Sequence, residues 1–418
     1  MASFAEGVEE FTGLLPPIQR LGTDEEFDCP RKHGDELVTC ALAPDGKWFA
    51  WSLGTRMVFV VQTQSDKAGC SFDELKKRKI GEKAEWNKKC LDCTVGVTAL
   101  EFGCRSSDIK WHSDQVHYKI VHNFPKGKIV LAAGLSNGEI KLWDLECGRI
   151  ILLLQDHKAA ITGLSFSPDG SLVLASASKD SSVKLWDLTD DGNMFKTLHC
   201  EHSKQVNAIA WSPVGQRIAS VGVLKMALLW NARTGTLERR LENGHLNDVT
   251  GCCFSPDGAL LFTSSWDTTV ICWDVQTGAK RTVYGHMFPP PRPIFAGGVN
   301  GHEVRGVTVC PDGMHIASVC RDGYIRVWNI FHGTNPIQKA ALRDARAVHF
   351  SHNGFLLAVG CQSGEMNFFA APMQTATLQH RCRLTVRQCI ISGDGCAALR
   401  ALVPRKAAQY LNYADIVT

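Results

Sequence analysis

Histidine, serine or threonine, and aspartate recur together along this chain, and these are the residue types of a nucleophilic catalytic triad. A triad is needed only once, because one aspartate orients one histidine that activates one hydroxyl. Here the constellation appears several times at a similar spacing and is followed each time by a tryptophan. A structural role is therefore favoured over catalysis, and we expect no catalytic residue. The recurring residues are His157, Asp180 and Trp186; His245, Asp267 and Trp273; and Asp322 and Trp328.

Cysteine is the second residue type that could do chemistry, since thiolates bind metals and form disulfides. The chain has 17 cysteines, and this odd count argues against complete pairing. Most lie within strand-like runs, where a reduced cysteine packs as a small apolar side chain. Cys90 and Cys93 could form a metal site with Cys104 and His112, but no second closely spaced ligand pair completes it. We therefore expect neither a metal nor a cofactor.

The segment that positions these residues is clearest at residues 244–278, GHLNDVTGCCFSPDGALLFTSSWDTTVICWDVQTG. It contains the strand-like runs Val249–Phe254, Leu260–Ser264 and Val270–Trp273, and turn-forming residues separate them. With a fourth strand expected from Val275 onward, the unit is one small antiparallel sheet. Such a sheet cannot bury both of its faces alone, so the unit must recur and its copies must stack.

The unit does recur, about seven times at a spacing of about 43 residues, which is the period of a propeller blade. Copies are marked by the turns Ala43-Pro-Asp-Gly46, Ser167-Pro-Asp-Gly170, Ser212-Pro-Val-Gly215, Cys310-Pro-Asp-Gly313 and Ser351-His-Asn-Gly354. Some copies depart from the pattern, because Leu224, Ser363 and Asn137 stand where the turn aspartate is expected. In those blades we expect apolar packing between sheets to replace the polar contacts.

These residues resemble the WD-repeat family over roughly residues 25–370, and the motif set is highly specific. The resemblance implies an all-β fold, a seven-bladed propeller. It also implies that the histidine, a strand serine or threonine, the turn aspartate and the tryptophan hydrogen-bond across each blade. His157, Asp180 and Trp186 would do so in one blade, and His245, Asp267 and Trp273 in another.

Domain boundaries follow from where the repeat starts and stops. We expect a flexible N-terminus at residues 1–24, a propeller at 25–371 and a separate C-terminal module at 372–418. The last blade lacks an outer strand of its own, so Glu25–Cys29 is predicted to fill that place and close the ring. A basic loop at 63–89 contains Lys76–Lys79, and it is either a solvated loop or a patch for an anionic partner or nuclear import.

A proline-rich insertion at 287–300 includes Phe288-Pro-Pro-Pro-Arg-Pro-Ile-Phe295. Proline favours an extended conformation with little entropy left to lose, and the flanking aromatic side chains are costly to leave in water. The insertion lies between two blades. It either docks a partner or packs against its own blade, and the sequence favours neither alternative.

After Pro372 the composition changes to that of an amphipathic helix. Leu378, Cys382, Val386 and Ile390 fall at steps of four, with arginines between them and Thr377 as an N-cap. Composition alone allows this helix to fold back and bury its apolar stripe on the propeller. The alternative is that the helix binds elongin, and this alternative rests on a resemblance to a known module.

The spacing Thr-Leu-x-x-x-Cys-x-x-x-Val resembles the elongin-binding part of a SOCS box. Carried over, Leu378 would be the main anchor in an apolar groove of elongin C, with Cys382 and Val386 beside it. The tail resembles the cullin-selecting part at Pro404, Tyr410 and Leu411, whereas Ala401, Leu402 and Ala407 do not match. A propeller followed by a SOCS box is the architecture of the WD-repeat and SOCS-box-containing proteins, and local phrases such as Asp190-Asp-Gly-Asn-Met194 extend the likeness.

Composition excludes several classes of function. The net charge of +3 is close to neutral, so nothing demands nucleic acid or an anionic membrane as a partner. No apolar run approaches the roughly 20 residues that span a bilayer. The first residues lack a basic segment followed by an apolar core, so we expect no secretory signal and an intracellular protein, cytoplasmic or nuclear.

The expected function is substrate recognition in a cullin-RING ubiquitin ligase, without bond chemistry of its own. The resemblance implies elongins B and C, cullin-5 with its RING subunit, and a protein substrate as partners. One alternative is a plain WD-repeat scaffold whose tail helix docks internally. Another is a nucleic-acid-associated propeller that uses the basic Lys76–Lys79 loop, against which the near-neutral charge argues.

Overall fold

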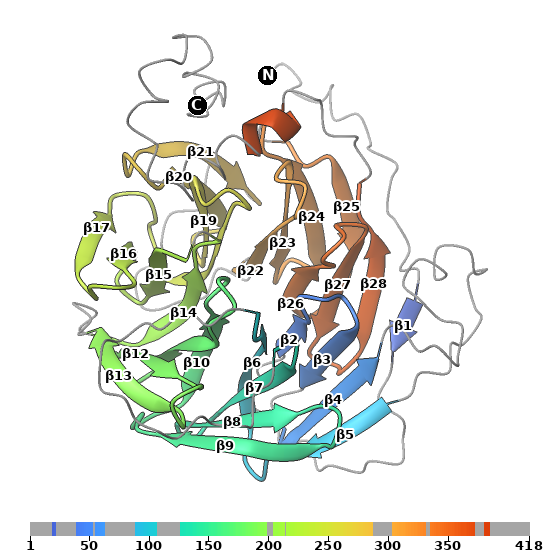
Figure 1. Ribbon diagram of the computed structural model, residues 1–418. Coiled ribbons are helices and arrows are strands. Elements are labelled where there is room, and N and C mark those ends of the chain that lie inside the picture. The colour runs from blue at the N-terminus through green and yellow to red at the C-terminus, as the bar shows by residue number, and fades with distance from the viewer. Residues whose placement is uncertain are drawn as a thin grey trace, which may run out of the picture.

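The alternation of strand-forming runs and tight turns builds seven four-stranded antiparallel sheets arranged in a ring (Figure 1). The structure is a computed structural model, and it describes residues 19–21, 39–52, 55–62, 88–106, 126–198, 204–213, 215–286, 303–331, 335–372 and 380–384. Each sheet is one blade, and one of its two edge strands, here called the inner strand, lies nearest the centre of the ring. The prediction of a seven-bladed propeller is confirmed.

The strands follow one another in the chain as follows. Blades 1 to 3 consist of β2 (Thr39–Leu42), β3 (Trp48–Ser52), β4 (Met57–Gln62) and β5 (Lys88–Asp92); β6 (Val97–Cys104), β7 (Ile129–Leu135), β8 (Glu139–Asp144) and β9 (Arg149–Gln155); β10 (Ile161–Phe166), β11 (Val173–Ser178), β12 (Val183–Asp187) and β13 (Asn193–Leu198). Blades 4 and 5 consist of β14 (Val206–Trp211), β15 (Arg217–Gly222), β16 (Ala227–Asn231) and β17 (Leu237–Leu241); β18 (Val249–Phe254), β19 (Leu260–Ser265), β20 (Thr269–Asp274) and β21 (Lys280–Gly285). Blades 6 and 7 consist of β22 (Val304–Val309), β23 (His315–Cys320), β24 (Tyr324–Asn329) and β25 (Gln338–Ala341); β26 (Ala345–Phe350), β27 (Leu356–Cys361), β28 (Met366–Ala370) and β1 (Gln19–Leu21).

The turns between the first and second strands explain why the strands end where they do. In blade 5 the Ser255 hydroxyl donates to Asp257 Oδ1 at 2.6 Å, and the Gly258 N–H donates to the Ser255 carbonyl at 2.8 Å. Gly258 has a φ of 67°, a left-handed conformation that glycine adopts without steric cost. This turn brings β19 back beside β18, with Phe254 paired to Leu261.

The core is divided among the blade interfaces. Seven clusters of buried apolar residues lie one at each interface between neighbouring sheets, including the interface between blades 7 and 1. A sheet that is apolar on both faces is stable only between two neighbours, as the repeat predicted. Blade 4, which has Leu224 in place of the turn aspartate, is held by such clusters on both sides.

The ring closes through the N-terminal strand β1, which pairs with β28 from Gln19 opposite Phe368 to Leu21 opposite Met366. The prediction that the last blade lacks an outer strand of its own is therefore confirmed, but the prediction that Glu25–Cys29 supplies it is wrong. Residues 22–38 separate β1 from β2, and Glu25–Cys29 lie there, outside the described residues. The propeller thus includes residues that the expected boundary at 25 assigned to the N-terminal segment.

Two further boundaries differ from the prediction. The fourth strand of blade 5 starts at Lys280 rather than at Val275, because the Asp274 carboxylate accepts hydrogen bonds from the N–H groups of Gln276 and Thr277 and holds a turn there. The basic loop predicted at 63–89 ends before β5. Lys89 lies in that strand, and its ammonium donates to the Leu145 carbonyl of blade 2 at 2.9 Å.

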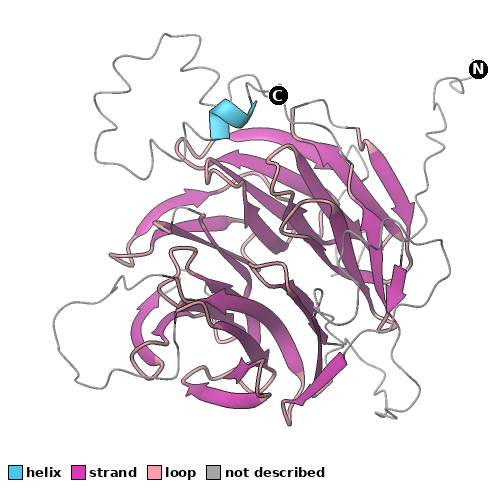
Figure 2. Ribbon diagram, turned by 45° about the vertical axis from the view of Figure 1, so that its right-hand side comes forward, coloured by secondary structure: helices cyan, strands magenta, loops and turns pink. Residues whose placement is uncertain are grey.

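Residues 380–384 form a helix that lies against one face of the ring (Figure 2). Among the described residues, no helix is long and apolar enough to cross a membrane. We call the face on which the inner strands begin the entry face, and the face on which they end in turns such as 255–258 the exit face.

Candidate functional sites

The recurring histidine, aspartate and tryptophan residues meet inside single blades. In blade 3, His157 Nδ1 lies 2.7 Å from Asp180 Oδ2, and His157 Nε2 lies 2.8 Å from Ser176 Oγ. The Trp186 indole N–H donates to the same hydroxyl at 2.8 Å. Blade 5 repeats the arrangement, with distances of 2.9, 2.7 and 2.8 Å, among His245, Asp267, Thr263 and Trp273.

The protonation states in blade 3 follow from the surroundings. Burial opposes the charge on Asp180, but hydrogen bonds from Ser182 and His157 outweigh it and lower the pKa of Asp180 to about 2. Burial lowers the pKa of His157. The carboxylate is thus ionised and the imidazole neutral at pH 7, so Nδ1–H donates to Asp180 and Nε2 accepts from the Ser176 hydroxyl.

This proton arrangement stabilises the blade and leaves no free nucleophile. The Ser176 hydroxyl donates to His157 and accepts from Trp186, and its side chain is fully buried. A catalytic hydroxyl must reach a substrate carbonyl, which a buried oxygen with both partners in place does not do. The network instead ties the loop before the blade to the second and third strands.

Blade 6 contains a third network, which the sequence motifs predicted only in part. Asp322 and Trp328 were predicted, whereas His286 was missed. His286 Nε2 lies 2.7 Å from Ser318 Oγ, which also accepts from the Trp328 indole at 3.0 Å. His286 precedes Asp322 by 36 residues because the 287–300 insertion intervenes, compared with 23 and 22 residues in blades 3 and 5. The Gly285-His286 pair was the available signal.

Arginine modifies the blade 6 network. His286 Nδ1 lies 3.9 Å from Asp322 Oδ2, and Arg326 contacts both His286 Nδ1 and, at 2.7 Å, the Asp322 carboxylate. Burial lowers the pKa of His286 to about 4, and the nearby His286 and Arg326 lower that of Asp322 against the effect of burial. The imidazole is therefore neutral here as well.

Two groups of side chains in blade 6 have metal-ligating types within 4.8 Å of one another, namely His286, Cys320 and Asp322, and Cys310, Asp312 and His315. The first group belongs to the network above, where the Arg326 cation already neutralises Asp322. In the second, Asp312 lies 2.6 Å from His315 Nδ1, and burial raises the pKa of the Cys310 thiol. A metal would need a thiolate there, so neither group fits one well.

The Cys-x-x-Cys pair considered from the sequence does not gather ligands in the described part of the chain. Cys90 lies in β5 and Cys93 is buried, where burial raises its pKa to about 11. Cys90, Cys93 and Cys104 do not form a metal-ligating group among the described residues, and His112 lies outside them. None of the cysteines that the structure describes forms a disulfide.

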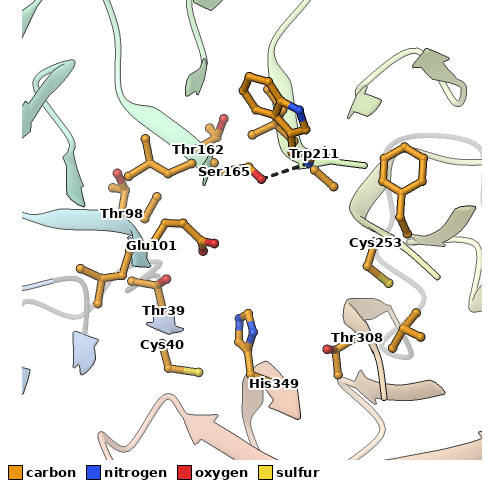
Figure 3. A pocket seen from close by; sticks show the side chains of 18 of the residues that line it. Thr39, Cys40, Thr98, Glu101, Thr162, Ser165, Trp211, Cys253, Thr308 and His349 are labelled. Atoms are coloured by element: carbon orange, nitrogen blue, oxygen red, sulfur yellow. Dashed lines mark hydrogen bonds between the residues drawn. The ribbon is translucent and has the colours of Figure 1, made fainter. Parts of the chain in front are cut away.

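The inner strands of all seven blades line a central channel with a cavity volume of about 360 Å³ (Figure 3). Glu101 of β6 and His349 of β26 extend their polar groups toward this cavity. Burial among protein atoms raises the pKa of Glu101 to about 8 and lowers that of His349 to about 4. Both groups are neutral near pH 7, and no sequence motif indicated either of them.

The C-terminal helix contacts blade 6 on the exit face. His380 is buried, and its Nε2 lies 2.9 Å from the Asp312 carbonyl oxygen. The Arg383 guanidinium is also buried and lies 5.0 Å from the centre of the Phe331 ring. Leu384 lies beside the Gly313 turn, where an added Cβ would come within 3.3 Å of it. The helix therefore does pack on the propeller.

The side of the helix that packs differs from the one that the apolar pattern favours. Cys382 is exposed, as is Arg381, while the arginine at 383 is almost completely covered. Of the predicted elongin-binding residues, Cys382 is thus on the outer side, and Leu378 and Val386 lie outside the described residues. The predicted cullin-binding residues Pro404, Tyr410 and Leu411 also lie outside them.

Comparison with known proteins agrees with the fold. The family model of the WD domain, G-beta repeat, matches residues 148–187, 192–231, 235–274 and 294–329. WD repeat and SOCS box-containing protein 1 from Homo sapiens is 38% identical over 438 residues, which cover 99% of this chain and 100% of the relative. The protein of that name from Danio rerio is 40% identical over 417 residues, covering 93% and 94%. Among solved structures, a chain in a crystal structure of the mitotic checkpoint complex has a TM-score of 0.62 at 19% identity and covers 89% of this chain and 100% of its own length, a likeness of fold alone.

Proposed function

The chain belongs to the WD repeat and SOCS box-containing protein family, and we propose that it is the substrate-recognition subunit of an elongin–cullin–RING ubiquitin ligase. The propeller would bind a target protein. Residues 372–418 would bind elongins B and C and a cullin-5 scaffold, and a RING partner would bring the conjugating enzyme. The name of the relatives supports the SOCS-box part of this proposal.

The observation that carries the proposal is the division of the C-terminal helix into two sides. His380 and Arg383 are buried against blade 6, whereas Cys382 is exposed. At 3.6 residues per turn, positions four apart share a face, so Leu378 and Val386 belong by sequence to the side of Cys382. The helix can therefore be held by the propeller and still offer an apolar stripe to an adaptor.

The contacts of His380 and Arg383 would fix the position of that stripe. A guanidinium over a partly desolvated aromatic ring contributes about 0.5–2 kcal/mol, and the His380 hydrogen bond adds to it. Such a docking fixes the target on the propeller relative to the adaptor. The protein would then act without bond chemistry, by raising the effective concentration of a target lysine near the charged conjugating enzyme.

Cullin selection by Pro404, Tyr410 and Leu411 belongs to the same proposal. The tail keeps these three residues of the expected pattern, but it has leucine at 402 where a proline is expected. Binding to elongins therefore has the stronger support of the two.

Co-expression with elongins B and C tests the proposal. A buried leucine is worth about 1.5–3 kcal/mol, so Leu378→Ala combined with Cys382→Ala should reduce recovery of elongin C with the full chain at least about tenfold. Arg381→Ala is the matched control, because it shortens another exposed side chain of the same turn and should leave recovery unchanged. Equal recovery with the double variant and wild type would refute the ligase assignment.

A further inference from the structure

A recurring hydrogen bond on the entry face defines equivalent positions in the described blades. The N–H of the first residue in each turn between the second and third strands donates to the carbonyl of the residue just before the inner strand. The six pairs are Ser136 to Gly96, Lys179 to Ala160, Val223 to Gln205, Trp266 to Asp248, Arg321 to Glu303 and Gln362 to Asp344, at 2.8–3.4 Å. These positions form a ring around the mouth of the channel, and they can be compared blade by blade.

In blades 2 to 5, the second residue of the inner strand belongs to the same ring and links neighbouring blades. Thr98 and Thr162 donate to carbonyls of the following inner strand, Ile161 at 2.5 Å and Val206 at 2.7 Å. Asn207 and Thr250 do the same, to Val249 and Val304, both at 2.8 Å. This small polar side chain therefore stabilises the joint between blades.

Blades 6 and 7 have arginine at this position, Arg305 and Arg346. Arg346 Nη2 donates to Gln362 Oε1 at 2.6 Å. Arg305 Nη1 is buried without a hydrogen-bond partner. Burial and the neighbouring Arg346 lower the pKa of Arg305 to about 10, so its surroundings disfavour the cation despite the nearby carboxylates. A structural link between blades would not require two like charges side by side.

Charge is concentrated on one side of the ring. The compared positions of blades 2 to 4 carry one charged side chain, Lys179, whereas those of blades 6 and 7 carry Arg305, Arg321, Arg346, Glu303 and Asp344. Glu303 lies 3.8 Å from Arg321, and both carboxylates act on Arg305. Within blades 6 and 7, three guanidinium groups against two carboxylates leave a formal charge of +1, which one carboxylate would balance. Asp248, at the compared position of blade 5, interacts with Lys204 and Lys225, whose charges offset its own.

Exposed apolar side chains lie on the neighbouring blade. On the entry face of blade 5, Leu246 is 48% exposed and Trp266 is 36% exposed. The Leu246 N–H donates to the carboxylate of Asp267, and Asp267 directly follows Trp266 in the chain. Leu246 and Trp266 therefore belong to the same corner of the blade. Blade 5 joins blade 6 through the Thr250–Val304 hydrogen bond. Tryptophan and arginine are the residue types that dominate the energetics of protein interfaces.

We propose that this arc of the entry face, composed of Leu246, Trp266, Arg305, Arg321 and Arg346, binds an extended peptide segment of a partner protein in which an aspartate or glutamate lies next to an apolar side chain. The carboxylate would pair with Arg305 and Arg346, and the apolar side chain would cover Trp266 and Leu246. A single carboxylate matches the net charge of +1 better than a dianionic phosphate does. This assignment rests on the proposed function, for which the arc would be the substrate-binding surface.

Selection of a phage-displayed library of random twelve-residue peptides on the immobilised full chain tests the arc. Selected peptides, synthesised with fluorescein, should contain an acidic residue next to an apolar one. Arg305→Thr combined with Arg346→Thr should weaken their binding at least tenfold. Threonine occupies this position in blades 2, 3 and 5, so the variant is compatible with the fold, and an unchanged Tm verifies this. Arg239→Thr with Arg240→Thr removes the same charge from the outer strand β17 and should leave the affinity unchanged.

The remaining arms decide the outcome. Replacing the acidic residue of the peptide by its amide should weaken binding to the wild-type chain as much as the arginine variant does. The same replacement should weaken binding to the arginine variant only a little further, because the interacting pair is already lost. Failure to select peptides, selection of peptides without acidic residues, or equal binding by wild type and the arginine variant would overturn the proposal. Elongin recovery should be the same for wild type and the arginine variant. A wild-type chain that binds the peptides but recovers no elongins would overturn the ligase assignment and leave the arc intact.

Discussion

At the level of single side chains, the propeller uses the same residue types for different purposes, according to burial. Ser176 and Thr263 each join a histidine to a tryptophan and are completely covered. Arg305, by contrast, replaces a threonine or asparagine that links blades elsewhere, and it leaves a buried donor without a partner. In a repeat protein, a residue that differs from those at the equivalent position of the other blades is informative, because the other blades show which residue types the fold requires there.

His349 provides a prediction at this scale. Its pKa in the folded protein is about 4 and its ordinary value is 6.5, so between these values the unfolded chain binds a proton that the folded chain does not. Stability should thus fall as the pH falls through this window. Replacing His349 by threonine, which is the residue at the equivalent position 308, should remove that loss.

Urea unfolding at pH 7.5 and pH 5.0 measures the effect. The channel leaves His349 partly accessible, which moderates the effect. We expect the free energy of unfolding of His349→Thr to rise by about 1–2 kcal/mol relative to that of wild type when the pH is lowered to 5.0. Thr308→Ala changes another channel side chain without a titrating group and should show no such gain. Parallel pH dependence of wild type and His349→Thr would show that the histidine does not contribute.

Sequence patterns predicted these side chains unevenly. Motifs within one blade, such as His245, Asp267 and Trp273, are close in the chain and were identified as a unit. His286 was missed because the 287–300 insertion lengthens the interval to Asp322. Glu101 and His349 come from strands 248 positions apart, and only closure of the ring brings them into one cavity. No local pattern indicates such a pairing.

At the level of elements, tight turns fixed most strand boundaries, and the errors occurred where side chains act on the backbone. β18 runs from Val249 to Phe254 as predicted, since the turn at 255–258 ends it. A fourth strand was predicted from Val275 onward, yet the Asp274 carboxylate holds that stretch in a turn. The closing strand was misplaced because β1 is only three residues long and its pairing partner lies more than 340 residues away.

Deletion of β1 should destabilise the ring. Without residues 1–21 the outer edge of β28 would lose its partner, and an unpaired edge both weakens the sheet and invites aggregation. Because β1 pairs three residues with β28, we expect the deletion to lower the Tm by about 5 °C or more, by differential scanning fluorimetry. Deleting residues 1–15, which keeps β1, is the control and should change the Tm little. An identical Tm for both deletions would contradict closure by β1.

At the level of the whole molecule, blade 6 connects the two proposed functions. Its inner strand β22 carries Arg305 near its entry-face end. On the exit face, β22 leads into the turn that contacts His380 and Leu384. Six residues of strand span about 20 Å. A target bound on the entry face and an adaptor bound to the C-terminal helix would thus lie at opposite ends of one rigid sheet, so neither would block the other.

The central claim is that the C-terminal helix is docked on one side and free on the other. Alkylation of Cys382 by iodoacetamide, quantified by mass spectrometry with and without elongins B and C, tests it most directly. Cys147 is also exposed and far from the helix in sequence, so it is the internal control. We predict that Cys382 reacts readily in the free chain and is protected at least tenfold by the elongins, while Cys147 reacts equally in both. A Cys382 that resists alkylation in the free chain, or that reacts as fast with the elongins present, would contradict the account.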